Sequence, residues 1–175
     1  MKPISLHDFA LQLYARPGME ALCLSLQDEH DADVNMLLFL CWRGHTGHRI
    51  TQQELNVAVG LSRRWSESVT APLRDIRRWM KQQAEAREDP AFSGLREGIK
   101  HLELEAELYQ LQRLAALDEG RDAAHGTTSP ATAIHDNLVD YARLARLQPS
   151  PPDDCWKQLV RHSRQISGQS DPASG

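Results

Sequence analysis

The sequence feature that most constrains the fold is the apolar run VNMLLFLCW at residues 34–42. It contains nine residues, one of them asparagine, and is too short for a membrane-spanning helix, which needs about 20 apolar residues. Asp33 precedes the run and can cap the start of a helix. A helix that is apolar nearly all round is buried on every side. The run therefore predicts a helix at the centre of a soluble core.

The rest of the chain carries helical signals and almost no strand signals. No segment alternates apolar and polar residues for long, and no Asn-Gly or Asp-Gly hairpin turn occurs. Thr51 and Glu54 form a capping-box pattern, the sharpest helix start in the chain. We predict an all-α protein, a compact bundle of about six to seven helices with no sheet. Helices are expected after Ser5, near 19–30, at 61–81, near 90–117 and near 132–147. Pro72 should either kink the helix at 61–81 or restart it, with Thr70 as the cap.

Length and composition predict one domain followed by a tail. A chain of 175 residues, 41% of them apolar, is long enough for one core and short for two. We place a single helical domain at 1–147, and a Pro-rich linker and largely disordered tail at 148–175. A short helix near 153–166 would interrupt this tail. Its apolar side forms a candidate docking segment for a partner: Trp156, Leu159 and Val160.

Charge and cysteine content favour a cytoplasmic protein. The formal net charge is -4, so binding to nucleic acid or to an anionic membrane would need a local basic patch. No secretion signal is expected, because Asp8 and Gln12 interrupt any apolar stretch near the start. The three cysteines form no CxxC pair, which fits a reducing compartment better than a disulfide framework. We expect no association with membranes.

The stretch CWRGHTGHR holds three potential zinc ligands, Cys41, His45 and His48. A structural zinc site needs four protein ligands, and a catalytic site needs three and a water. Cys41 belongs to the buried run, whereas the two histidines follow Gly44. In the alternative interpretation, Gly44 is a helix C-cap and Gly47 a turn residue. This alternative is preferred, and no metal or other cofactor is expected.

The stretch ITQQELNVAVGLSRRW looks like a helix-turn-helix, with a capped helix, a glycine at the turn and arginines in the second helix. Two positions depart from the usual pattern. Asn56 stands where a small residue lets the helices pack closely, and Ser66 where an aliphatic residue is usual. The alternative is an exposed basic face on an amphipathic helix at 61–81. The candidate nucleic-acid or partner surface comprises Arg63, Arg64, Arg74, Arg77, Arg78 and Lys81.

The long helix near 90–117 carries two adjacent apolar stripes, one starting at Leu95 and the other at Leu104. So wide an apolar face is either core or the seam of a homodimer. Glu103 and Glu107 lie one turn apart, a pattern typical of a solvent-exposed face. No Ser-His-Asp, Cys-His, P-loop or GxGxxG pattern indicates an enzyme. We therefore predict an adaptor or regulator that acts through protein contacts, with nucleic-acid binding by the basic helix as the alternative.

Two motifs give the chain a family resemblance: FALQLYARPGMEALCLSLQDEHDADVNMLLFLCWRGHTG and WSESVTAPLRDIRRWMK, with a looser third, ELEAELYQLQRLA. With these motifs the chain resembles an uncharacterised proteobacterial family of small helical proteins, a domain of unknown function, over roughly residues 5–115. The resemblance implies a fold but no activity, cofactor or catalytic residue. Trp42, Gly44 and Gly47 belong to the shared motif and the two histidines do not, which favours a structural role for this stretch.

Overall fold

The computed structural model describes residues 4–118 and 128–166, and every regular element in these ranges is helical. The predicted all-α class is confirmed, since these ranges contain no strand. The elements are α1 (Leu6–Tyr14), α2 (Met19–His30), α3 (Val34–His45), α4 (Gln52–Trp65), a π-helical turn (Ser66–Thr70), α5 (Ala71–Gln82), α6 (Glu85–Glu88), α7 (Pro90–Ala116), α8 (Pro130–Ala145) and α9 (Asp153–Ser163).

The helices start where the sequence places caps. Asp33 Oδ1 accepts a hydrogen bond from the backbone N of Met36 at 3.2 Å, which starts α3. At the start of α4, the Thr51 hydroxyl accepts from the backbone N of Glu54 at 3.3 Å. The Glu54 carboxylate accepts in return from the backbone N of Thr51 at 2.7 Å. The capping box is therefore confirmed, and so is the turn at Gly47, whose φ is 80°.

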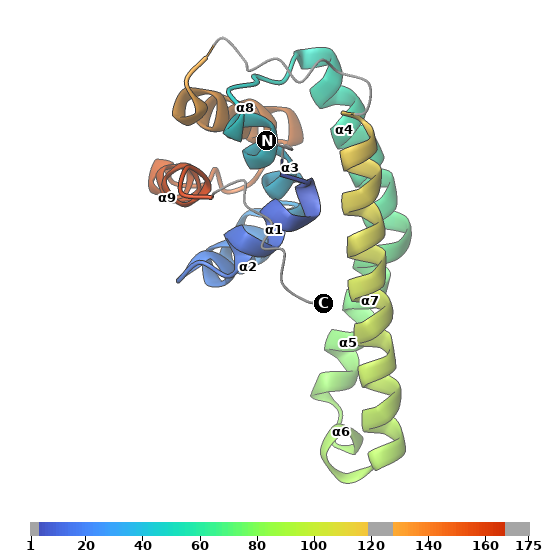
Figure 1. Cartoon of the computed structure of the whole chain (residues 1–175). Coiled ribbons are helices and arrows are strands. Elements are labelled where there is room, and N and C mark those ends of the chain that lie inside the picture. Colours follow the sequence, from blue (N-terminus) through green and yellow to red (C-terminus); the bar gives the residue numbers. More distant parts are fainter. Residues whose placement is uncertain (1–3, 119–127, 167–175) are drawn as a thin grey trace, which may run out of the picture.

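Helix α3 is the centre of a globular body that also contains α1, α2, α8 and α9 (Figure 1). Its residues from Met36 to Cys41 are all buried, as the apolar run predicts. Helix α8 approaches α3 closely at Gly44, where a Cβ would lie 2.5 Å from the backbone N of Ile134. The predicted C-cap at Gly44 is wrong, because α3 continues to His45. Gly44 is instead the position at which the two helices touch.

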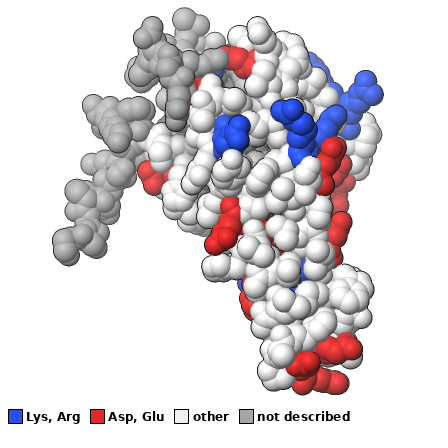
Figure 2. Space-filling model, turned by 90° about the vertical axis from the view of Figure 1, so that its right-hand side faces the viewer, with Lys and Arg blue, Asp and Glu red and all other residues white. Residues whose placement is uncertain are grey.

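Helices α4, α5 and α7 form an arm that extends past the body and ends at α6 (Figure 1). Helices α4 and α5 follow one another along α7 and are joined by the π-helical turn at Ser66–Thr70. The sequence predicted a compact bundle and gave no sign of this projection. Figure 2 faces the arm side and shows acidic residues gathered at the tip, where Glu85, Glu88 and Asp89 are exposed.

The helix-turn-helix considered as an alternative for this stretch does not form. Gly60 does not occupy a turn, because α4 runs through it from Gln52 to Trp65. Pro72 lies in the first turn of α5, directly after the π-helical turn, and the backbone stays helical from Trp65 through Thr70 and Ala71. Helices α4 and α5 both follow α7 (Figure 1), whereas the two helices of a helix-turn-helix cross at about 90–120°.

The core extends beyond residue 147, where the sequence placed the end of the domain. In α9, Trp156 is 4% exposed and Leu159 is fully buried, both in the same cluster as the residues of α3. The connection before α9 is also held, since His30 Nδ1 lies 2.6 Å from the carbonyl oxygen of Pro149. The predicted docking segment is therefore occupied by the chain's own core, and Val160 packs against the same cluster. Residues 167–175 of the predicted tail lie outside the described residues.

Candidate protein-binding groove

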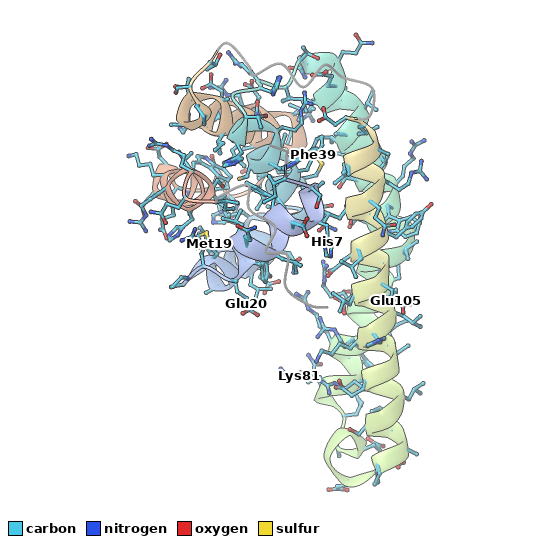
Figure 3. The ribbon with its side chains drawn as sticks, viewed as in Figure 1. His7, Met19, Glu20, Phe39, Lys81 and Glu105 are labelled. Atoms are coloured by element: carbon cyan, nitrogen blue, oxygen red, sulfur yellow. The ribbon has the colours of Figure 1, made fainter. Side chains whose placement is uncertain are left out.

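A groove separates the α1–α2 side of the body from the arm. Its volume is about 1300 Å³, and its lining residues come from α1, α2, the start of α3, the π-helical turn, α5 and α7. In Figure 3, His7 lies on the side of α1 that faces α7, whereas Glu105 lies on the far side of α7. The two walls thus come from segments far apart in the sequence.

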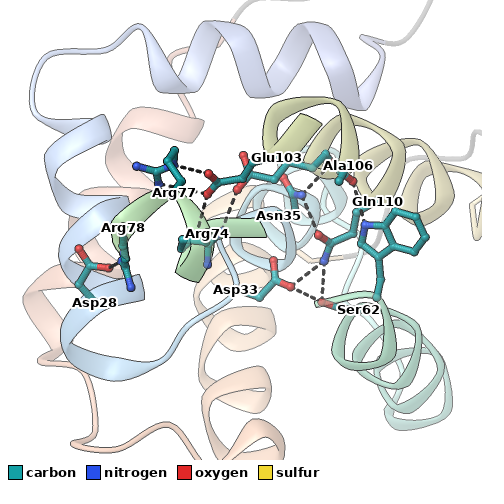
Figure 4. Close-up of polar contacts among 12 residues, drawn as sticks. Asp28, Asp33, Asn35, Ser62, Arg74, Arg77, Arg78, Glu103, Ala106 and Gln110 are labelled. Carbon is teal, nitrogen blue, oxygen red and sulfur yellow. Dashed lines mark hydrogen bonds and ion pairs between the residues drawn. The ribbon is translucent and has the colours of Figure 1, made fainter. Parts of the chain in front are cut away.

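Polar side chains beside this groove tie the arm to α3 (Figure 4). Asp33 Oδ2 accepts hydrogen bonds from the Ser62 hydroxyl and, at 2.6 Å, from Gln110 Nε2. Asn35 Nδ2 donates to Gln110 Oε1 at 3.1 Å and to the carbonyl oxygen of Glu107 at 2.9 Å. Ser62 and Gln110 are buried, so loss of one partner would leave a desolvated polar group. These bonds fix the position at which α4 and α7 leave the body.

Farther along the arm, two arginines of α5 bind two glutamates of α7. Arg74 Nε lies 3.0 Å from Glu103 Oε1, and Arg74 Nη2 lies 2.8 Å from Glu107 Oε1. Arg77 donates to both carboxylate oxygens of Glu103. Glu103 is only 6% exposed. The predicted solvent-exposed face is therefore wrong for Glu103, because α5 places two cations against it.

The two glutamates have pKa values shifted in opposite directions. Burial raises the pKa of Glu103, but the hydrogen bonds and positive charges of Arg77 and Arg74 outweigh burial and leave this pKa below its ordinary value. Burial also raises the pKa of Glu107, and hydrogen bonding to Arg74 does not overcome it, so this pKa lies above its ordinary value. Glu107 is therefore the first of the two to take up a proton as the pH falls.

Four exposed leucines line the two walls of the groove. Leu11 on α1 is 57% exposed and Leu24 on α2 is 42% exposed. On the opposite wall, Leu104 and Leu108 of α7 are 51% and 38% exposed. Single exposed leucines are common on proteins, but apolar side chains gathered in one hollow are typical of a binding surface.

The groove also carries an excess of negative charge. Eight Asp or Glu side chains line it, compared with four Lys or Arg side chains. Each of these four cations already contacts a carboxylate of this chain. In contrast, the exposed carboxylates of Glu20, Asp31 and Asp75 form no ion pair with another described residue. The charge left for a ligand is therefore negative.

The predicted basic residues do not form one free surface. Arg74 and Arg77 are bound to glutamates, and Arg78 Nη2 lies 2.6 Å from Asp28 Oδ1. All three line the acidic groove, which would repel a polyanion. The other three are exposed at the ends of α4 and α5: Arg63, Arg64 and Lys81.

The three potential zinc ligands have separate environments. Cys41 is fully buried in the core, and burial raises its pKa to about 12. The His45 ring packs on Phe9 with ring centroids 5.3 Å apart, and burial lowers its pKa. His48 Nδ1 lies 2.8 Å from the Thr46 hydroxyl. Across residues 4–118 and 128–166, no group of three or more His, Cys, Asp or Glu side chains is arranged to hold a metal ion.

Sequence reasoning missed much of the groove. Leu11 and Leu24 could have been found from the sequence, because they lie outside the apolar stripes of their helices. An apolar residue in such a position does not face the core. The polar partners gave no comparable signal, because Ser62 and Gln110 look like ordinary surface residues of a helix. Only the tertiary contact between α3, α4 and α7 reveals them.

No curated protein and no solved structure matches the chain significantly. In the described helices, none combines the length and apolar character needed to cross a membrane. A family model described as a protein of unknown function, DUF2390, matches residues 5–114. The match runs from the start of α1 to near the end of α7, so it includes both walls of the groove. The chain therefore belongs to the DUF2390 family of proteins of unknown function.

Proposed function

We propose that this protein is a cytoplasmic adaptor or regulator that binds a segment of a partner protein in the groove between α1–α2 and the arm. The observation that carries the proposal is the convergence of four exposed leucines on one hollow. Burial of an exposed leucine side chain contributes about 1.5–3 kcal/mol when it is complete. These four side chains are 38–57% exposed, so a partner that covers them would gain about half of this value at each.

The fixed position of the arm supports the same proposal. Gln110 joins α7 to α3 and α4, and Glu103 joins α7 to α5, so the outer wall is held by directional bonds at two points along α7. A wall that is already ordered loses little conformational freedom when a partner binds. An ordered wall of this kind supports the proposal, because the groove needs little rearrangement to accept a partner.

The test compares two pairs of leucines on the same helix. Leu104→Ser with Leu108→Ser removes apolar surface from the groove without adding charge. Leu95→Ser with Leu102→Ser makes the same change at residues of α7 that do not line the groove and are 60% and 52% exposed. Each full-length variant would be tagged and used for quantitative capture from the native cell.

The expected result is a partner retained by the wild type and by the Leu95/Leu102 control but lost from the Leu104/Leu108 variant. A partner retained equally by all three chains would contradict binding in the groove. Circular dichroism would confirm that each variant keeps its helical content.

A homodimer along α7 is the second candidate, favoured by further exposed apolar residues of the arm. Ile76, Trp79, Leu95 and Leu102 are each 46–60% exposed and do not line the groove. Light scattering over a concentration series would detect such a dimer. If Leu95→Ser with Leu102→Ser converts the dimer to a monomer, the dimer forms along α7. A wild-type protein that stays monomeric at high concentration would rule out this candidate.

A further inference from the structure

The secondary structure of the walls determines what kind of segment the groove can hold. Both walls are helices whose backbone N–H and C=O groups bond within each helix. An extended segment would find no sheet edge with which to pair its own backbone groups. A helical segment satisfies these groups internally. The groove therefore favours a helix over an extended peptide.

The size of the groove agrees with a short helix. A helix about 10 Å in diameter has a volume of about 400 Å³ per turn. The groove, at about 1300 Å³, has room for about three such turns. Over this length, an apolar stripe with steps of three or four residues offers two or three anchoring side chains to Leu11, Leu24, Leu104 and Leu108.

The unpaired carboxylates give the charge of the occupant. Glu20 and Asp31 are on or directly after α2, and Asp75 is on α5, so negative charge lies on both walls. Like charges on the two walls of a cleft add their fields within it and raise the local concentration of cations. Lys or Arg side chains at the two edges of a bound helix would meet these carboxylates.

One ion pair shows that the groove already accepts a cation from the opposite wall. Arg78 of α5 lies 2.6 Å from Asp28 of α2, and the two side chains are 48% and 51% exposed. An exposed ion pair of this kind contributes little to folding stability. A Lys or Arg of the partner can therefore replace Arg78 at Asp28.

We propose that the occupant of the groove is a basic amphipathic helix of a partner protein, with leucine-like residues on one face and Lys or Arg residues at its edges. This inference rests on the proposed function and adds the chemistry of the partner. A second copy of this chain fits less well, because the chain has a net charge of -4 and its arm ends in acidic residues. Nucleic acids and anionic lipids are repelled by the same carboxylates.

The probe is a fluorescein-labelled synthetic peptide of about 14 residues with leucines at helical spacing and lysines elsewhere. A second peptide replaces every lysine with glutamate. A third keeps the composition but distributes the leucines around the helix. Fluorescence anisotropy would follow each titration with the full-length protein at low and at high salt. Only the first peptide is expected to bind, with an affinity that falls as the salt concentration rises.

Variants of the protein identify the surface that binds the peptide. Leu104→Ser with Leu108→Ser is expected to weaken binding about tenfold or more, and the Leu95→Ser with Leu102→Ser control by less than about twofold. Asp31→Lys with Asp75→Lys changes two exposed carboxylates and is expected to weaken binding about tenfold. Equal binding of the lysine and glutamate peptides, or of the ordered and redistributed peptides, would overturn the inference.

The outcomes separate this inference from the proposed function. If none of the peptides binds but a captured partner still depends on Leu104 and Leu108, the basic-helix inference fails and the groove function stands. If capture also proceeds without these leucines, both fail. Unchanged peptide affinity in the Asp31/Asp75 variant would overturn the charge argument alone, since the apolar contacts would then account for all of the binding.

Discussion

The body and the outer part of the arm are stabilised by different kinds of contact. In the body, α1 and α3 bury Phe9, Leu13 and Leu37 completely among other apolar side chains. In the arm, α5 buries only Met80, and the buried residues of α7 include the polar Glu103 and Gln110. Where the arm meets the body, α4 and α7 add buried apolar residues such as Leu55 and Leu114 to the same core as α3. Farther out, directional polar bonds between α5 and α7 take the place of a buried apolar core. The arm thereby keeps apolar side chains exposed that a compact bundle would have covered.

The largest difference between the two regions is expected for removal of an apolar side chain. Phe9→Ala in the body should lower the free energy of unfolding by about 3–5 kcal/mol, because it leaves a cavity in a packed core. Leu104→Ala in the arm, at 51% exposure, should lower it by less than about 1 kcal/mol. Urea unfolding followed by circular dichroism measures both. A comparable loss of unfolding free energy in the two variants would contradict the proposed difference between the body and the arm.

Replacing a helical glycine with alanine should have opposite effects on stability at two positions, Gly44 and Gly60. Gly44→Ala places a methyl group 2.5 Å from the backbone of Ile134 and should destabilise the protein by about 1–3 kcal/mol through overpacking. Gly60→Ala meets no atom within 4 Å and should stabilise α4 by up to about 1 kcal/mol through helix propensity. Thermal unfolding of the two variants decides the point. A stabilising Gly44→Ala would show that α3 and α8 have room to separate.

The ion pairs of the arm should make its stability depend on pH. The folded-state pKa of Glu103 lies below its ordinary value of 4.5, so its contribution is present above pH 4.5 and is lost as the pH falls through the lower pKa. Glu103→Gln should therefore destabilise by about 1–2 kcal/mol near neutral pH, and the difference from the wild type should close in acid. Urea unfolding at neutral and acidic pH tests this.

Glu107 serves as the matched control for Glu103. Its pKa is raised in the folded protein, so its ionised form opposes folding above that pKa and the opposition disappears in acid. Glu107→Gln should therefore be close to neutral or slightly stabilising near neutral pH. If Glu103→Gln and Glu107→Gln destabilise the protein equally at neutral pH, the two glutamates do not have pKa values shifted in opposite directions.

Local signals in the sequence were enough for the helices but not for the arm. The caps at Asp33 and Thr51 and the apolar run after Asp33 act within a few residues, and each predicted its helix correctly. The groove depends on contacts over longer distances, such as Gln110 with Asp33, which are 77 positions apart. Residue type alone led to two wrong predictions, because Gly44 was interpreted as a helix C-cap and Trp156 as a docking residue for a partner. Close helix packing and core burial explain those two residues, and neither leaves a local signature.

A small stability effect, and the sharpest test of the groove, is expected at Arg78. Arg78→Ala breaks an exposed ion pair with Asp28, so the free energy of unfolding should change by only about 0.2–1 kcal/mol. Binding of the lysine peptide should nevertheless strengthen, because Asp28 becomes free to pair with the peptide. Lys81→Ala is the matched control, since it removes the same charge from α5 at a residue that does not line this groove. A gain in affinity from Arg78→Ala alone would place the peptide's cation at Asp28, whereas equal gains would show that only the overall charge of the protein matters.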